Sequence, residues 1–510
     1  MNDAPPPSRA DLPAHVDVVV VGAGLSGIGA GYRLQTECPD RDYLILEARD
    51  AIGGTWDLFR YPGIRSDSDM FTLGYPFEPW LHEKAIADGD TILGYVRRTA
   101  AKHGIDRHIR FRTKVLAADW STSTARWTLT VERRDEAGGV STETMTCSFL
   151  YSCAGYYDYD RGHEPELPGI DEFRGEVVRP QFWPEGLDYA GKDVLVIGSG
   201  ATAVTLVPAM AEHARKVTML QRTPTWISAL PGRDAIADRI RTALPERVAH
   251  RVVRSKNILF STAFYQFCRR RPERAKRLLL SLNAQQLGDE RLVAEHFTPP
   301  YDPWDQRLCV VPDGDLFEAM KRGTAEVVTD HIDTFVPEGV RLRSGKVLEA
   351  EIVVTATGLQ LLAFGGIDPS VDGVPVDLSK QFVWRGAMVT GLPNFAVCIG
   401  YTNASWTLRA DLTSRLVCKV LDHMRRHELA AVEPRPDREL RERPLIDLAS
   451  GYVQRSIGAF PKQGDRGVWR VRQNYLLDAA TTMRTNLSRT LAGTPEAAVR
   501  EPAPPVELAS

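Results

Sequence analysis

Two stretches of the chain alternate aliphatic and helix-favouring segments in the order strand, helix, strand. The first has an aliphatic run from Val16 to Val21, helical composition over residues 25 to 36, and a strand-like run from Tyr43 to Glu47. The second begins with DVLVIGSGATAV at Asp193 and closes with VTMLQR at Val217 to Arg222. Each stretch has the length of a β–α–β unit, about thirty residues. The pattern predicts an α/β protein with two parallel-sheet cores.

The remaining segments divide between these two cores. Residues 229 to 299 break the alternation and have helical composition, which predicts a helical insertion in the second core. Proline and glycine punctuate residues 159 to 191, as in a linker. The strand-like run LPNFAVCIG (392 to 400) has no partner of its own, so we expect the chain to return to the first core. The expected boundaries are 1–160 and 361–510 for the first core, 161–228 (with the linker) and 300–360 for the second, and 229–299 for the insertion.

Composition narrows the class of protein. Of 510 residues, 43% are hydrophobic and 25% are charged, and the net charge is -3, so nothing draws the whole chain to nucleic acid. The seven cysteines are scattered, without a Cys-x-x-Cys pair or metal-ligand spacing, and we expect no metal site. No signal peptide or membrane span is evident. We expect a cytoplasmic protein with a short disordered leader, a mobile tail and a small-molecule substrate.

A glycine fingerprint follows the first strand. Gly22, Gly24 and Gly27 have the Gly-x-Gly-x-x-Gly spacing that permits a tight turn, close approach of a pyrophosphate and close packing of helix on strand. The free N–H groups of the helix N-terminus would face the phosphates. Glu47 ends the next strand, where a carboxylate accepts hydrogen bonds from ribose hydroxyls. The first core therefore predicts FAD or NAD, but not a nucleotide with a 2′-phosphate.

The second fingerprint differs at the position that reads the ribose. Gly198, Gly200 and Ala203 carry the motif within GSGATA, and Ala201 and Thr202 begin its helix. The following strand ends in Arg222 and Thr223 instead of an acid. A guanidinium can bind a 2′-phosphate bidentately, whereas an acid would repel it. We therefore expect two Rossmann-like dinucleotide-binding domains, one for FAD or NAD and one for NADPH.

Longer motifs support a family resemblance over nearly the whole chain. They are GGTW (53–56), RYPGIRSD (60–67), FRGEVVRPQFWP (173–184), GSGATA (198–203), DPWDQRLCVVP (302–312), TATG (355–358) and GYTNASWTL (400–408). In their order and spacing, the chain resembles the class B flavin monooxygenases, and most closely the Baeyer–Villiger monooxygenases of the ethionamide-activating type. One residue departs from the family fingerprint: Arg179 stands where the family has histidine, and it cannot exchange a proton near neutral pH. We expect Arg179 to serve a positional role.

The resemblance implies site residues and chemistry. Arg307 matches the family's active-site arginine, and Asp67 the carboxylate that holds it in place; Gly54, Thr55, Trp56 and Asp67 fall at the FAD site. The implied reaction converts a ketone to an ester or lactone with NADPH and dioxygen through a C4a-peroxyflavin, and sulfides or thioamides are implied as further substrates. A monooxygenase acting only on nitrogen or sulfur is the alternative. A flavoprotein disulfide reductase would need a redox cysteine pair, and a dinucleotide-binding module without catalysis would consume no NADPH.

The insertion carries a basic stretch. Between residues 247 and 277 ten Lys or Arg residues face one acid, Glu273, around the uncharged run NILFSTAFYQFC. A helix with a solvated basic face is the ordinary interpretation. A weak peripheral membrane contact is the alternative. No nucleic-acid-binding motif accompanies the charge. We predict no particular oligomeric state.

Overall fold

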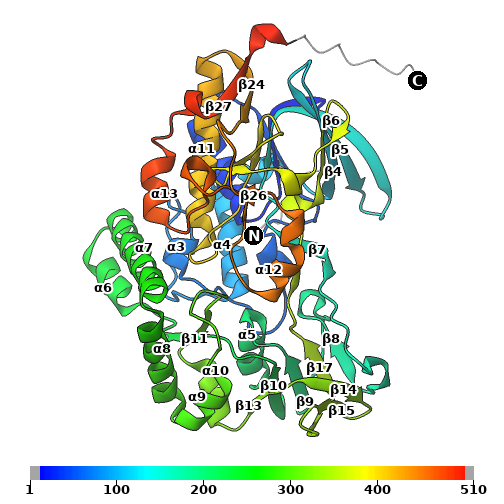
Figure 1. Cartoon of the computed structure of the whole chain (residues 1–510), viewed down its shortest axis with the longest axis vertical. Coiled ribbons are helices and arrows are strands. Elements are labelled where there is room, and N and C mark those ends of the chain that lie inside the picture. The colour runs from blue at the N-terminus through cyan, green and yellow to red at the C-terminus, as the bar shows by residue number, and fades with distance from the viewer. Residues whose placement is uncertain (1–11, 500–510) are drawn as a thin grey trace, which may run out of the picture.

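The structure, a computed structural model, describes residues 12–499. The expected mobile tail (502–510) and residues 1–11 of the expected leader lie outside this range. Figure 1 shows one sheet in the upper part of the molecule and a second in the lower part, around β9, β10, β13 and β17. No helix among residues 12–499 is both long and apolar enough to cross a membrane.

The upper sheet is built around β1 (His15–Val21), whose middle residues Val18 to Val20 have no exposed surface. It pairs in parallel with β2 (Tyr43–Leu46) on one side and β6 (Val140–Ser152) on the other. Helix α1 (Leu25–Glu37) makes the crossover between β1 and β2. β23 (Phe395–Val397) pairs in parallel with β6, so the late strand-like run joins this sheet. The other strands of the sheet are β3 (Ile109–Arg110), β4 (Thr113–Ser121), β5 (Arg126–Arg134), β19 (Asp368–Val371), β20 (Val374–Pro375), β21 (Val383–Trp384) and β22 (Met388–Val389).

The lower sheet is wholly parallel, in the order β13-β10-β9-β17-β8. Its strands are β8 (Glu176–Val178), β9 (Asp193–Ile197), β10 (Lys216–Gln221), β13 (Ala325–Thr329) and β17 (Ile352–Thr355). The edge strand β8 comes from the stretch expected to be a linker, because Val177 and Val178 pair with β17. Helices α5 (Ala201–Met210) and α10 (Asp315–Lys321) belong to this part of the chain, as does the meander β14 (Ile332–Val336), β15 (Gly339–Leu342) and β16 (Val347–Glu349).

Four helices project from the second core, between two short strands that pair in parallel. These strands are β11 (Ile227–Leu230) and β12 (Cys309–Pro312), so the helices begin a few residues after the expected start at 229. The helices are α6 (Ala235–Ala243), α7 (Glu246–Arg270), α8 (Pro272–Leu287) and α9 (Glu290–His296). In Figure 1 α6, α7 and α8 lie along one side of the molecule, and α7 reaches toward α3 of the upper part.

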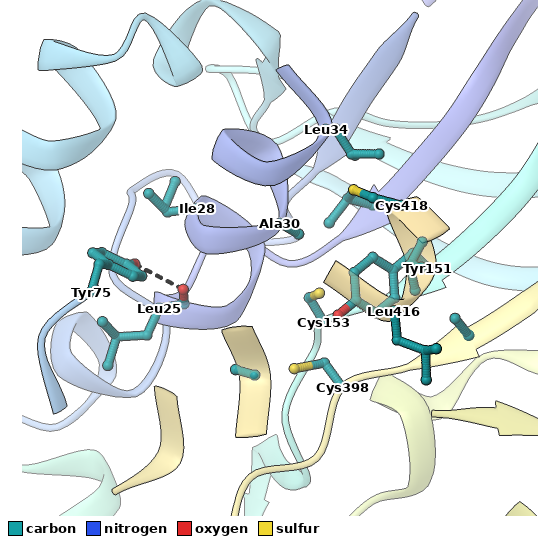
Figure 2. Packing of buried hydrophobic residues seen from close by; sticks show 14 of the residues in the cluster. Leu25, Ile28, Ala30, Leu34, Tyr75, Tyr151, Cys153, Cys398, Leu416 and Cys418 are labelled. Carbon is teal, nitrogen blue, oxygen red and sulfur yellow. Dashed lines mark hydrogen bonds between the residues drawn. The ribbon is translucent and has the colours of Figure 1, made fainter. Parts of the chain in front are cut away.

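Helix α11 (Trp406–Arg426) packs along α1 in the core of the upper part. Figure 2 shows Leu25, Ile28 and Leu34 of α1 with Leu416 and Cys418 of α11, and Tyr75, whose hydroxyl donates to the Leu25 carbonyl at 2.8 Å. The other helices of this part are α2 (Thr55–Leu58), α3 (Met70–Leu73), α4 (Gly89–Lys102), α12 (Gly451–Ser456) and α13 (Tyr475–Thr482). Short strand pairs complete it: β7 (Tyr157–Gly162) with β18 (Leu359–Leu361), β24 (Leu429–Pro434) with β27 (Leu491–Pro495), and β25 (Arg443–Pro444) with β26 (Lys462–Gln463).

Candidate active site

The first glycine turn requires glycine at two of its three fingerprint positions, Gly22 and Gly27. Gly22 has φ +98°, and a Cβ atom on Gly27 would lie 1.8 Å from the Gly22 carbonyl oxygen. A Cβ atom on Gly24 would meet the Cα of Gly54 at 3.5 Å, because the GGTW segment packs directly on the turn. Gly24 is the N-cap of α1 and no side chain caps this helix. The first N–H groups of α1 are thus left for a ligand, as a pyrophosphate requires.

Glu47 lies against this turn. Its carboxylate is 5% exposed and accepts hydrogen bonds from the backbone N–H groups of Ala23 (2.6 Å) and Arg49 (2.9 Å). Burial raises the pKa of Glu47, and the two backbone hydrogen bonds oppose that shift. The carboxylate is held in a fixed orientation beside the turn, where it can accept ribose hydroxyls.

Sequence reasoning missed a buried carboxylate nearby. Asp57 is 2% exposed and forms ion pairs with Arg49 (2.6 Å), Arg97 (2.9 Å) and Arg60 (3.2 Å). Arg49 and Arg60 are close to Asp57 in sequence, but Arg97 comes from α4 and could not have been assigned without the fold. This cluster fixes the GGTW segment against α4.

A cavity of about 780 Å³ extends from the first glycine turn to Ala201 and Thr202, at the start of α5. The residues predicted for the site that line this cavity are Gly22, Gly24, Glu47, Gly54, Thr55, Trp56, Asp67, Ala201, Thr202 and Arg307. Trp56 also packs partly against the hydrophobic core, so it contributes to both the cavity wall and the core. Tyr401 and Trp406, from the GYTNASW segment, line the same cavity. Gly27, Gly198, Gly200, Ala203, Arg222 and Thr223 lie outside its lining.

The second glycine turn resembles the first. Gly198 has φ +141°, and a Cβ atom there would lie 2.3 Å from the Ala356 carbonyl oxygen. Gly200 is exposed, and a Cβ atom there would meet nothing within 4 Å, so this face of the turn is open. Ala203 is fully buried against the sheet. Arg222 is exposed at the end of β10, and Thr223 accepts a hydrogen bond from Ser199 at 3.0 Å, which ties that strand end to the turn.

The RYPGIRSD segment bridges the two cores. Gly63 has φ +75°, and a Cβ atom there would lie 2.6 Å from the Cβ of Ala209 on α5. Burial raises the pKa of Tyr61 to about 12, and its hydroxyl contacts Thr202. Arg65 forms an ion pair with Asp315 at the start of α10. These contacts place Asp67, the last residue of the segment, at the junction of the cores.

Arg307 and Asp67 meet in the cavity. Arg307 Nη1 lies 3.1 Å from Asp67 Oδ2, and the arginine side chain is 30% exposed. The charge of Asp67 is the largest influence on the Arg307 guanidinium and raises its pKa well above the usual value, while burial opposes the shift. Three tyrosines that sequence reasoning missed, Tyr156, Tyr157 and Tyr452, also surround the arginine. Arg307 is therefore a fixed cation that stays charged throughout the ordinary pH range.

Arg179, which replaces the fingerprint histidine, lies outside the cavity. Its side chain is 47% exposed and forms an ion pair with Glu164 at the surface. Its backbone precedes a short 3-10 turn (Pro180–Phe182) next to the edge strand β8. The structure shows no contact between Arg179 and the residues around Arg307 among those described.

The residues at both turns fit dinucleotides. Each turn places a helix N-terminus without a side-chain cap beside a glycine whose Cβ atom would clash, Gly27 at the first turn and Gly198 at the second. Each is followed by a strand whose end is the place for a ribose-reading residue. Glu47 provides an acceptor at the first turn, and Arg222 provides a cation at the second. No group of three or more His, Cys, Asp or Glu side chains that could hold a metal ion occurs within residues 12–499.

Comparison with known proteins places the chain in a family. A family model described as flavin-binding monooxygenase-like matches residues 70–238, and one described as an NAD(P)-binding Rossmann-like domain matches residues 20–81. The FAD-containing monooxygenase EthA of Mycobacterium tuberculosis (strain ATCC 25618 / H37Rv) is 52% identical over 91% of this chain and 94% of its own. The probable FAD-binding monooxygenase AlmA of Acinetobacter baylyi is 45% identical over 91% of this chain and 93% of its own.

Solved structures share the fold. An oxidized steroid monooxygenase bound to NADP superposes with a TM-score of 0.74 over 94% of this chain and 99% of its own, at 22% identity. The OTEMO complex with FAD and NADP superposes with a TM-score of 0.66 over 82% of this chain and 86% of its own, at 23% identity. From the fold, the two glycine turns and the sequence identity, the chain belongs to the family of FAD-containing flavin monooxygenases.

Proposed function

We propose that this flavin monooxygenase uses NADPH and dioxygen to convert ketones to esters or lactones, and that it also oxygenates sulfides or thioamides. In the ketone reaction one oxygen atom of O₂ enters the bond between the carbonyl carbon and a neighbouring carbon. The other oxygen atom leaves as water, whose two hydrogens come from the hydride of NADPH and from one solvent proton, and NADPH is oxidised to NADP⁺. The observation that carries the proposal is the Arg307–Asp67 ion pair in the cavity between the first glycine turn and the start of α5.

The two turns divide the cofactors between them. FAD, when bound, supplies the activation of dioxygen, and the protein supplies binding, orientation and electrostatics. The first turn and the N-terminus of α1 would hold the FAD pyrophosphate, and Glu47 its ribose. The second turn would hold NADPH, with Arg222 at the 2′-phosphate. Gly54, Thr55 and Trp56 would close the wall on the FAD side.

Arg307 favours the ketone reaction for an electrostatic reason. Attack on a carbonyl carbon places negative charge on the carbonyl oxygen, whereas oxygen transfer to a sulfide sulfur creates no such anion on the substrate. A cation held beside that oxygen stabilises the developing charge. Asp67 holds the guanidinium in place through their 3.1 Å contact and keeps it charged. The buried phenols of Tyr157 and Tyr452 have raised pKa values, so they add no negative charge to the site.

Product analysis tests the proposal. The purified FAD-loaded protein is incubated with NADPH and either 2-octanone or methyl phenyl sulfide, and the products are identified by gas chromatography with mass spectrometry. We expect an ester from 2-octanone and a sulfoxide from the sulfide. Sulfoxide without ester would show a monooxygenase restricted to heteroatoms. NADPH consumption with neither product would contradict the proposal altogether.

A further inference from the structure

Helix α7 contacts both chain segments that carry the catalytic pair. The expectation from sequence was a basic helix with a solvated face or a weak membrane contact through residues 247–277. Most of the cations in this stretch are exposed, as a solvated basic face requires. Arg254 is buried, however, and Asn257 and Arg269 of α7 also bind carboxylates of other segments. Asn257 binds Asp69, two residues after Asp67, and Arg269 binds Asp305, two residues before Arg307.

Near its middle, at Asn257, α7 contacts the turn that follows Asp67. Asp69 is the N-cap of α3: its Oδ1 accepts the backbone N–H of Thr72 at 2.9 Å, and its Oδ2 accepts the Thr72 hydroxyl at 2.7 Å. Asn257 of α7 donates to the same Oδ1 at 2.8 Å. The carboxylate that organises this turn is therefore itself fixed by α7.

Arg254 secures the other end of α3. Its side chain is 7% exposed, and Nη1 donates to the carbonyl oxygens of Phe71 (2.9 Å), Thr72 (3.1 Å) and Gly74 (2.8 Å). Carbonyl groups at a helix C-terminus have no partner within the helix, and a cation there complements the helix dipole. Thr72 in turn forms a 2.6 Å hydrogen bond with Ser405, next to the cavity residue Trp406. Arg254 thus holds α3 between Asp67 and the α11 wall of the cavity.

Near its C-terminus, at Arg269, α7 contacts the turn that precedes Arg307. Asp305 Oδ2 accepts the backbone N–H of Asp302 at 3.2 Å, which closes that turn. Arg269 of α7 donates to Asp305 Oδ1 at 2.6 Å. Lys276 of α8 adds an ion pair of 2.7 Å with Asp302. The arrangement resembles that at Asn257. In both places an α7 side chain binds the carboxylate that shapes a turn, beside Asp67 in one case and beside Arg307 in the other.

We propose that α7 is a brace that sets the separation of Asp67 and Arg307, with Asn257, Arg254 and Arg269 as positioning residues. Arg254 and Arg269 are fifteen positions apart, about 22 Å along a helix that rises 1.5 Å per residue. A helix that is fixed near its middle by Arg254 and Asn257 and near its C-terminus by Arg269 holds the two turns at one relative position, although they come from different cores. The expected effect of the brace on ester formation rests on the proposed function, whereas its effect on the Arg307–Asp67 distance does not.

Substitutions of Asn257 and Arg269 test the brace in the full-length, FAD-loaded enzyme. Arg269→Gln and Asn257→Ala each remove one contact, and Arg269→Lys restores the charge. Arg270→Gln, at the exposed neighbour of Arg269, is the matched control. We expect Arg269→Gln and Asn257→Ala to lower ester formed per NADPH on the order of 10-fold to 100-fold, because misplacement by about 1 Å has effects of that size. The KM for NADPH should stay unchanged, and Arg269→Lys should recover most of the yield.

Two further readouts separate a brace from a general structural role. In an Asp67→Ala background, Arg269→Gln should cause no further loss, because both changes act on the same arginine; additive losses would overturn the proposal. Crystal structures of Arg269→Gln and Asn257→Ala should show the Arg307–Asp67 separation lengthened from 3.1 Å to beyond about 4 Å. An unchanged separation in both variants would also overturn it. If the wild-type enzyme makes no ester, the proposed function fails, and the separation alone then decides for or against the brace.

Discussion

The carboxylate of Glu47 accepts a 2.6 Å hydrogen bond from the backbone N–H of Ala23, in the middle of the first glycine turn. The end of β2 is thereby tied to the loop between β1 and α1. The carboxylate that we propose for the ribose and the turn that we propose for the pyrophosphate are thus held together in one unit. Such preorganisation lowers the entropic cost of binding.

Glu47→Gln should weaken FAD binding. A glutamine amide keeps one acceptor oxygen but loses the charge and the second acceptor, so either Ala23 or the ribose loses its partner. Loss of one charge-assisted hydrogen bond corresponds to about 10-fold or more in affinity. Quenching of flavin fluorescence on titration of the apoprotein measures the change. Glu176→Gln, at an exposed position on β8, is the control, and equal FAD affinity in Glu47→Gln and the control would refute the role of Glu47.

Arg222→Ala should reduce the preference for NADPH over NADH. Arg222 is exposed at the end of β10, where a 2′-phosphate would lie, and NADH lacks that phosphate. We expect the KM for NADPH to rise about 10-fold to 100-fold while the KM for NADH stays the same. Steady-state kinetics with both nucleotides measure this. An equal rise for both would assign Arg222 to a general structural role.

Acid should destabilise the protein through Glu78. Burial raises the pKa of this carboxyl, but hydrogen bonds from Lys102 (2.8 Å) and His103 (3.0 Å) lower it, and the net shift is downward from 4.5. Because the pKa in the folded state is depressed, the stabilisation is present above pH 4.5 and is lost as the pH falls through the folded-state value. Thermal denaturation between pH 3.5 and 7 should show a smaller fall in Tm for Glu78→Gln than for the wild type. Parallel curves would show that Glu78 contributes nothing to the pH dependence.

Local patterns in the sequence predicted the two β–α–β units well. The aliphatic run at Val16 to Val21 is the strand His15–Val21, and the run at Val217 to Arg222 is the strand Lys216–Gln221. These predictions are confirmed because a buried parallel strand followed by a glycine turn is specified by neighbouring residues. The placement of Arg307 beside Asp67 came from the family resemblance, because the two residues are distant in sequence and only the fold brings them together.

Other features required the three-dimensional structure. Arg254 is read from sequence as one more cation of a basic helix, yet it is buried against three carbonyl groups. Arg97 of α4 forms an ion pair with the buried carboxylate of Asp57 in α2, forty residues earlier in the sequence. The stretch expected to be a linker contributes strand β8, because Val177 and Val178 find partners on β17. In each case a partner distant in sequence overrides the local composition.

Arg307 supplies the cation for ketone oxygenation in the mechanism that we propose. The rate of ester formation from 2-octanone by Arg307→Ala tests this role directly. We expect the variant to bind FAD and NADPH and still to reduce the flavin, because Arg307 acts on charge that develops on the substrate. Ester formation should fall by about 10²–10³, the usual effect of removing a positioned donor at developing charge. Asp67→Ala should show a milder loss, because the cation remains but is less well oriented. Ester formation by Arg307→Ala at the wild-type rate would contradict the account.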